Sequence, residues 1–121
     1  MIEIDDAFYR ISKPDFEMLI PRWEGSAPET ADEADATITL SDGTRRYATF
    51  MTLGVVNKIM DRWRDTGECL SGRYFWLSHL VVIREPGFDS MIAAVQDLIA
   101  TGEIDDACGV LPPFAEEAMD Q

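Results

Sequence analysis

The chain has 121 residues, 46% apolar and 10% aromatic, which is enough apolar content for one compact domain and excludes disorder throughout. Its 23 acidic residues outnumber ten Lys and Arg residues, and the formal charge of -13 would repel phosphate backbones and anionic lipid surfaces. The amino terminus carries acids in place of Lys or Arg, and no apolar run approaches the ~20 residues that cross a bilayer. We therefore expect a cytoplasmic protein with neither nucleic-acid nor membrane partners.

The first part of the chain predicts short elements followed by an acidic loop. Alternating apolar residues within 2–11 predict one or two short strands. Ser12, followed three residues later by Asp15, is typical of a helix start, so one or two helical turns are expected up to Pro21. Residues 24–35 combine glycine, proline and clustered acids with little to bury, which predicts a mobile acidic loop.

A β-hairpin is expected after this loop. In residues 36–40 threonines alternate with isoleucine and leucine, and residues 44–52 show a second alternation. Between the two runs, Asp42 and Gly43 form a turn pair that tolerates positive φ angles. The two strands should therefore form an antiparallel ribbon with one covered face.

Two amphipathic helices are expected in the second half of the chain. The first covers residues 53–66, with Thr52 as its cap and Gly67 as its left-handed end. The second follows a cap at Asp89 and ends at Gly102. Their apolar residues recur every three or four positions, as one buried helical face requires: Val56, Ile59, Met60 and Trp63 in the first, and Phe88, Met91, Ile92, Val95, Leu98 and Ile99 in the second.

The remaining segments complete an α+β domain. Residues 73–84 are rich in aromatic and β-branched side chains, which predicts a strand covered on both faces. Residues 103–108 predict one more helical turn, and the tail at about 112–121 should fray, although Phe114 could dock. The element order predicts a single domain, residues 1–121, in which an antiparallel β-sheet packs against two main α-helices.

The charges are distributed unevenly along the chain. Residues 1–35 carry a net charge of -7, residues 36–84 carry +3, and residues 85–121 carry -9. Soluble proteins commonly intersperse both signs, and self-repulsion of this size opposes folding. The layout therefore favours a positively charged partner, while acidity that serves solubility alone is the alternative.

Few residues in the sequence suggest catalysis. The chain has one histidine, His79, for which a structural role is expected, and its two cysteines, Cys69 and Cys108, are expected to be reduced thiols. No phosphate-binding loop, nucleophile elbow, paired-histidine zinc motif or EF-hand loop occurs. We therefore expect no enzyme activity, cofactor or metal site; a small enzyme would instead need His79 in a cavity.

The three tryptophans differ in their expected roles. Trp63 lies on the apolar face of the first helix and should be a core residue. Trp76 is expected in the core, unless one face of its strand is open and it forms an exposed anchor with Tyr74. Trp23 precedes the acidic loop, where it could either anchor a partner or pack beneath the loop.

The stretch from RYATFMTLGVV to LSHLVVI, residues 46–83, is followed by a helix and a GEIDDAC turn. In this part, about half of the chain, the sequence resembles small acidic bacterial immunity proteins of polymorphic and contact-dependent growth-inhibition toxin systems. The resemblance implies a small cytoplasmic single-domain protein that binds a toxin domain, often a cationic nuclease. These families share no catalytic signature, so the resemblance assigns a role and no functional residue.

Charge and expected exposure indicate which residues would contact such a partner. The candidates are Glu24, Glu29, Asp32, Glu33 and Asp35 in the acidic loop, with Trp23 as an anchor. The predicted function is non-catalytic: binding and occlusion of a cognate basic protein, a toxin domain. The alternative is a small regulatory or homodimeric interaction module whose acidity serves solubility only.

Overall fold

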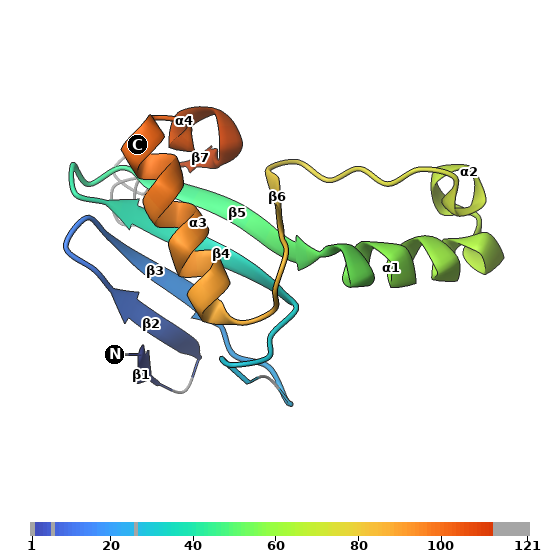
Figure 1. Ribbon diagram of the computed structural model, residues 1–121, viewed down its shortest axis with the longest axis horizontal. Coiled ribbons are helices and arrows are strands. Elements are labelled where there is room, and N and C mark those ends of the chain that lie inside the picture. The colour runs from blue at the N-terminus through green and yellow to red at the C-terminus, as the bar shows by residue number, and fades with distance from the viewer. Residues whose placement is uncertain (1, 6, 26, 113–121) are drawn as a thin grey trace, which may run out of the picture.

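The computed structural model describes residues 2–5, 7–25 and 27–112 of the chain. One sheet and a projecting helix are its main features (Figure 1). The elements are, in order, β1 (Ile2–Ile4), β2 (Phe8–Ser12), β3 (Phe16–Pro21), β4 (Glu33–Leu40), β5 (Arg45–Thr52), α1 (Leu53–Thr66), α2 (Glu68–Gly72), β6 (Leu80–Ile83), α3 (Phe88–Thr101), α4 (Ile104–Ala107) and β7 (Gly109–Leu111).

The sheet is mainly an antiparallel meander. Strands β1 to β5 pair with their sequence neighbours in antiparallel order. Along the outer side of β5, β7 pairs antiparallel with its first half and β6 pairs parallel with its second half. The predicted α+β class, with an antiparallel sheet and two main helices, is confirmed, and β5–β6 is the one parallel pair among the described strands.

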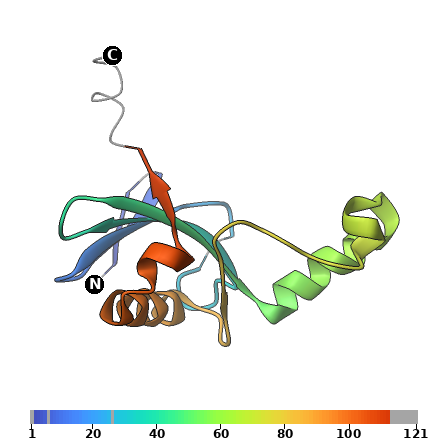
Figure 2. The same cartoon turned by 90° about the horizontal axis from the view of Figure 1, so that it is seen from above.

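The core lies between one face of the sheet and α3. Four residues of α3, namely Phe88, Met91, Ile92 and Val95, are buried against inward-facing residues of β2 to β5. The rings of Tyr9 and Phe88 meet edge to face with centroids 5.1 Å apart. In Figure 2, α3 and α4 lie on one side of the sheet and no described helix covers the other side. Within the part of the chain that the structure describes, the sheet therefore has one buried face and one open face.

Helix α1 continues directly from β5 and extends away from the sheet (Figure 1). Its first turn contacts β5 and buries Val55, after which the chain turns at α2 and returns along α1 to β6. We call residues 53–79 the arm. Trp63, expected in the core, is instead half-buried in the arm, where its ring stacks on that of Phe75 with the centroids 5.4 Å apart. No helix in the described ranges combines the length and apolar character that crossing a membrane requires.

The predicted hairpin and both long helices are confirmed. At the hairpin, the Asp42 carboxylate accepts a hydrogen bond of 2.9 Å from the Thr44 N–H. The Thr52 hydroxyl accepts one of 3.3 Å from the Val55 N–H and so caps α1. Left-handed glycines end both helices, as expected. The cap predicted for α3 is wrong, because the helix begins at Phe88 with Gly87 as its N-cap, and Asp89 lies in its first turn.

Three predictions about strands are wrong. The helix expected between Ser12 and Pro21 is strand β3, because its alternation of buried and half-buried side chains has a period of two. Strand β4 begins at Glu33, so the last three residues of the predicted loop 24–35 belong to a strand. Of residues 73–84, only Leu80–Ile83 form a strand.

The exposure of Trp76 corrects one more prediction. Its side chain is 66% exposed on the returning segment of the arm, so Trp76 is not a core residue. Tyr74, at 48%, is exposed as well, as the alternative expected, but neither residue lies on a strand. The predicted frayed tail, including Phe114, lies outside the described residues from 113 onward.

Candidate functional site

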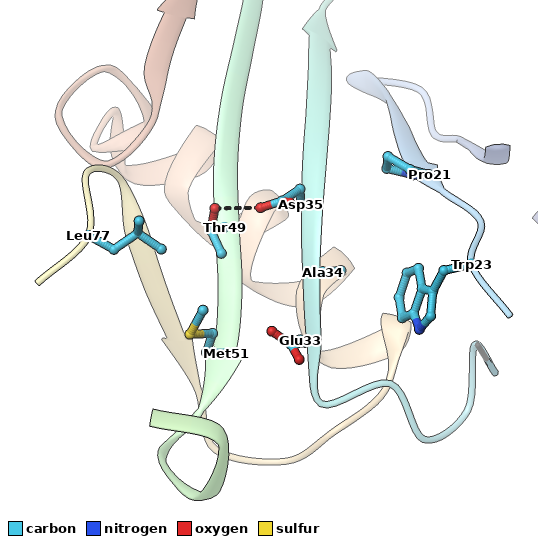
Figure 3. A pocket seen from close by; sticks show the side chains of 8 residues that line it. All are labelled: Pro21, Trp23, Glu33, Ala34, Asp35, Thr49, Met51 and Leu77. Carbon is cyan, nitrogen blue, oxygen red and sulfur yellow. Dashed lines mark hydrogen bonds between the residues drawn. The ribbon is translucent and has the colours of Figure 1, made fainter. Parts of the chain in front are cut away.

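The open face of the sheet carries a pocket of about 390 Å³ (Figure 3). It lies where the ends of β3, β4 and β5 meet the segment that returns from the arm. Eight residues line it: Pro21, Trp23, Glu33, Ala34, Asp35, Thr49, Met51 and Leu77. The lining thus combines two carboxylates with apolar and aromatic side chains.

The strand register builds the floor of this pocket. Glu33 pairs with Met51 and Asp35 pairs with Thr49 across the β4–β5 ribbon. Residues two apart on a strand share a face, so both carboxylates project from the same side of β4. Ala34 is buried between them and points to the opposite face. The two carboxylates are thus placed by backbone pairing and not by a flexible loop.

These carboxylates have no cationic partner within the described residues. Asp35 Oδ1 accepts a hydrogen bond of 2.7 Å from the Thr49 hydroxyl, which is a neutral donor. No hydrogen bond or ion pair to the Glu33 side chain occurs in the described part of the chain. The pocket therefore keeps its negative charge available to a ligand.

The arginines on the sheet and just after β3 bind partners outside the pocket. Arg10 pairs with Glu17 at 2.7 Å, and Arg46 pairs with Asp105 of α4 at 2.7 Å. Arg45 donates a hydrogen bond of 2.9 Å to the carbonyl of Pro112. Arg22 donates to the carbonyl of Asp5 and lies over the Tyr9 ring. These contacts hold the nearby guanidinium groups in positions other than the pocket.

Apolar side chains form the walls. Trp23 follows the end of β3, and its side chain is 43% exposed. Leu77 comes from the returning segment of the arm and is 41% exposed. In Figure 3, Trp23 and Leu77 stand on opposite sides of the β4–β5 ribbon, with Glu33 and Asp35 between them. An exposed indole beside two unpaired carboxylates suits an organic cation better than a hydrated metal ion.

The structure brings together three of the six residues proposed from the sequence. Trp23, Glu33 and Asp35 line the pocket. Glu24 and Glu29 are exposed in turns that do not line it, and Asp32 is half-buried just before β4. The backbone carbonyl of Asp32 accepts a hydrogen bond of 3.0 Å from the Thr52 N–H.

Part of the acidic segment is bound to the beginning of α3. The N–H of Gly87 donates a hydrogen bond of 2.7 Å to the Ala31 carbonyl, and that of Phe88 donates one of 2.8 Å to the Pro28 carbonyl. Ala31 is buried. These contacts fix the backbone just before β4 and thereby position Glu33.

Sequence reasoning missed five pocket residues: Thr49, Met51, Leu77, Pro21 and Ala34. Thr49 and Met51 could have been found from the alternation of Glu33, Ala34, Asp35 and Ala36. This alternation extends β4 toward the amino terminus, and a longer β4 pairs with the part of β5 that contains Thr49 and Met51. Acidic residues and alanine are poor strand formers, so this segment is typical of a loop when read locally. No local pattern indicates Leu77, because its position depends on the path of the arm.

The other candidate residues lie away from the pocket. His79 is half-buried, and its ring meets the edge of Tyr47 with centroids 5.0 Å apart. Cys69 is half-buried in the arm and Cys108 is buried, where desolvation raises the pKa of its thiol. Within the described ranges, no three His, Cys, Asp or Glu side chains are grouped so as to hold a metal ion.

Comparisons with known proteins add no relative. No protein-family model, no curated protein and no solved structure matches this chain.

Proposed function

We propose that this chain is a non-catalytic binding protein that neutralises a cognate cationic toxin domain, such as a nuclease, by binding and occluding it. The observation that carries the proposal is the pocket on the open sheet face. Glu33 and Asp35 lack a cationic partner there and are flanked by exposed apolar side chains. The resemblance of residues 46–83 to immunity proteins supports the same role.

Charge and apolar area have different tasks in this mechanism. A nuclease binds phosphate through a positive cleft, and an acidic inhibitor is attracted by the same field, which speeds association. Once bound, desolvated aromatic and aliphatic side chains slow dissociation. The exposed side chains of Trp23 and Leu77 would supply that contact, while the surrounding carboxylates pair with Lys and Arg. Inhibition follows because the toxin cleft is covered.

The test starts from the reading frame beside the gene for this chain, which we expect to encode a secreted protein with a basic domain at its carboxyl end. We expect co-expression of this chain to restore growth of cells that produce the domain. Replacing Glu29, Asp32, Glu33 and Asp35 together by their amides should weaken binding at least about tenfold, because several charge-assisted contacts are lost. Titration calorimetry measures the affinity, and unchanged affinity would remove these residues from the interface.

Salt dependence distinguishes this function from the second candidate, a homodimeric or regulatory module. That candidate is favoured by the arm, which has four basic and three acidic residues in an otherwise acidic chain and exposes Leu70, Tyr74 and Trp76. Steered association with the basic domain should slow severalfold between about 50 mM and 300 mM NaCl, measured by stopped flow. An association rate that does not depend on salt would favour the module.

A further inference from the structure

We infer that the open-face pocket is a receptor for one arginine side chain of the basic partner. The inference rests on the proposed function and names the group that the pocket recognises. It is carried by three features of the described residues: two unpaired carboxylates on one strand face, an exposed indole beside them, and an apolar wall across from the indole.

The spacing of the carboxylates suits a planar, forked cation. Residues two apart on a strand have their side chains roughly 7 Å apart on one face. Glu33 and Asp35 can therefore approach the guanidinium group from two sides, since its five N–H donors point along different edges of one plane. The single ammonium of lysine would pair well with one carboxylate and leave the other poorly compensated.

The tryptophan adds selectivity for the flat cation. A guanidinium plane stacks on an indole face and keeps its edges free for hydrogen bonds, so Trp23 and the two carboxylates act on different parts of the same group. Leu77, which is 41% exposed, lies on the other side of the carboxylates and offers apolar surface to the aliphatic stem of the arginine; Met51 lies on the same side but is 7% exposed.

The carboxylates of the pocket have oxygen atoms available to bind such a ligand. Asp35 uses one carboxylate oxygen for the Thr49 hydroxyl, which leaves its second oxygen for a guanidinium N–H. Arg10, Arg45 and Arg46 are held by other partners. A cation from outside would therefore complete the pocket without first breaking an internal ion pair.

The experiment measures binding of small arginine mimics to the full chain. The probes are N-acetyl-arginine methylamide, the lysine analogue, and the citrulline analogue, which has nearly the shape of arginine without its charge. Backbone and indole N–H shifts in NMR titrations report where each probe binds. We expect dissociation constants of about 1 mM for arginine, several times weaker for lysine, and no saturable shift at Trp23 for citrulline.

Matched variants separate the pocket from the general negative field. E33Q combined with D35N removes two charges inside the pocket, and E85Q combined with D97N removes one exposed Glu and one exposed Asp charge outside it. The first pair should weaken arginine binding at least about tenfold and the second less than about twofold. W23A should also weaken binding, whereas W76A removes an exposed tryptophan elsewhere and should not.

The outcomes distinguish the two proposals. Equal affinity for the arginine and citrulline probes, or equal losses in the two double variants, overturns the arginine pocket even if the basic domain still binds and growth is restored. A saturable, arginine-selective shift at Trp23 supports the pocket. If that shift is seen while the basic domain neither binds nor is neutralised, the proposed function is wrong and the arginine site stands.

Discussion

Asp42 shows how one side chain can hold a turn in a charge-dependent way. Its carboxylate accepts hydrogen bonds from the hydroxyl of Thr44 at 2.7 Å and from the Thr44 N–H at 2.9 Å. Both hydrogen bonds lower the pKa of Asp42 below its ordinary value, and the one from the Thr44 hydroxyl has the larger effect. The ionised form is therefore the one that stabilises the β4–β5 hairpin.

The pH dependence follows from this sign. Because the pKa of Asp42 is lower in the folded chain, its contribution is present at neutral pH and is lost as the pH falls through the folded-state pKa. D42A should destabilise the protein at pH 7, and its difference from the unaltered chain should shrink in acid. Urea unfolding at pH 7 and at about pH 3 measures this difference.

The neighbouring exposed residue Ser41 provides the control. S41A should have little effect at either pH, because no hydrogen bond of the Ser41 side chain holds the turn in the described residues. A D42A penalty that is the same at both pH values would contradict the role given to the carboxylate.

At the scale of elements, α2 is unusual in its handedness. Cys69, Leu70 and Ser71 have φ angles of 49°, 54° and 57°, so this turn of the arm is left-handed. Each such residue other than glycine costs about 1–2 kcal/mol relative to the right-handed region, because its Cβ crowds the following carbonyl. The arm is thus held in a conformation that its local sequence disfavours.

Glycine at one of these positions should therefore stabilise the arm. Ser71 is exposed, so S71G loses no buried contact; relief of strain exceeds the roughly 0.5–1 kcal/mol entropic cost of glycine. We expect a net gain of about 0.5–1 kcal/mol, seen as slower hydrogen exchange of the arm amides.

Substitution of a residue in α1 by glycine is the matched control. K58G, at an exposed right-handed position, should destabilise the arm by about 1 kcal/mol. G72A should be harmful for another reason, since a Cβ there would lie 2.1 Å from the Met60 carbonyl oxygen. If S71G and K58G act in the same direction, the left-handed turn is not strained as described.

The elements also show what could be predicted from the sequence. Helix α1 was predictable because its cap, its apolar period and its left-handed glycine agree, whereas α3 and the hairpin were predictable from their apolar periods and from a glycine with positive φ. For β3, the Ser12 and Asp15 cap signal conflicted with the alternation of Phe16, Met18 and Ile20, and pairing with β2 and β4 decided the outcome. Pairing partners distant in sequence cannot be read from a local pattern.

The candidate site was predictable to a similar extent. Glu33 and Asp35 were identified by their charge, and Trp23 was identified by its position before the acidic loop. The pocket itself required the register that places Thr49 and Met51 opposite these acids, and the arm that brings Leu77 back to the sheet. Glu24 and Glu29 had the same charge signal, and tertiary structure alone separates them from the pocket.

At the scale of the whole molecule, excess negative charge should limit stability. The chain has 23 acidic and ten basic residues, and three ion pairs occur among the described residues. Repulsion between surface carboxylates is screened over about 10 Å at 0.1 M salt. Raising NaCl from about 10 mM to 200 mM should therefore increase the midpoint of thermal unfolding by a few degrees.

Potassium chloride provides a control for specific cation binding. An equal increase with KCl indicates screening, because Na⁺ and K⁺ screen alike at one ionic strength, whereas a specific site would bind them with different affinity. A midpoint that falls with either salt would mean that attractive charge pairs outweigh the repulsion.

The two strands that pair with the outer side of β5 are synthesised at different times. Its second half is paired by β6, but its first half is paired by β7, which leaves the ribosome more than fifty residues later. Until then the nascent polypeptide has Arg45, Arg46 and Tyr47 along an unpaired β edge, a surface on which strands of other chains can add. The sheet is consequently completed late in synthesis. A truncated product that ends before Gly109 would keep this unpaired strand edge permanently.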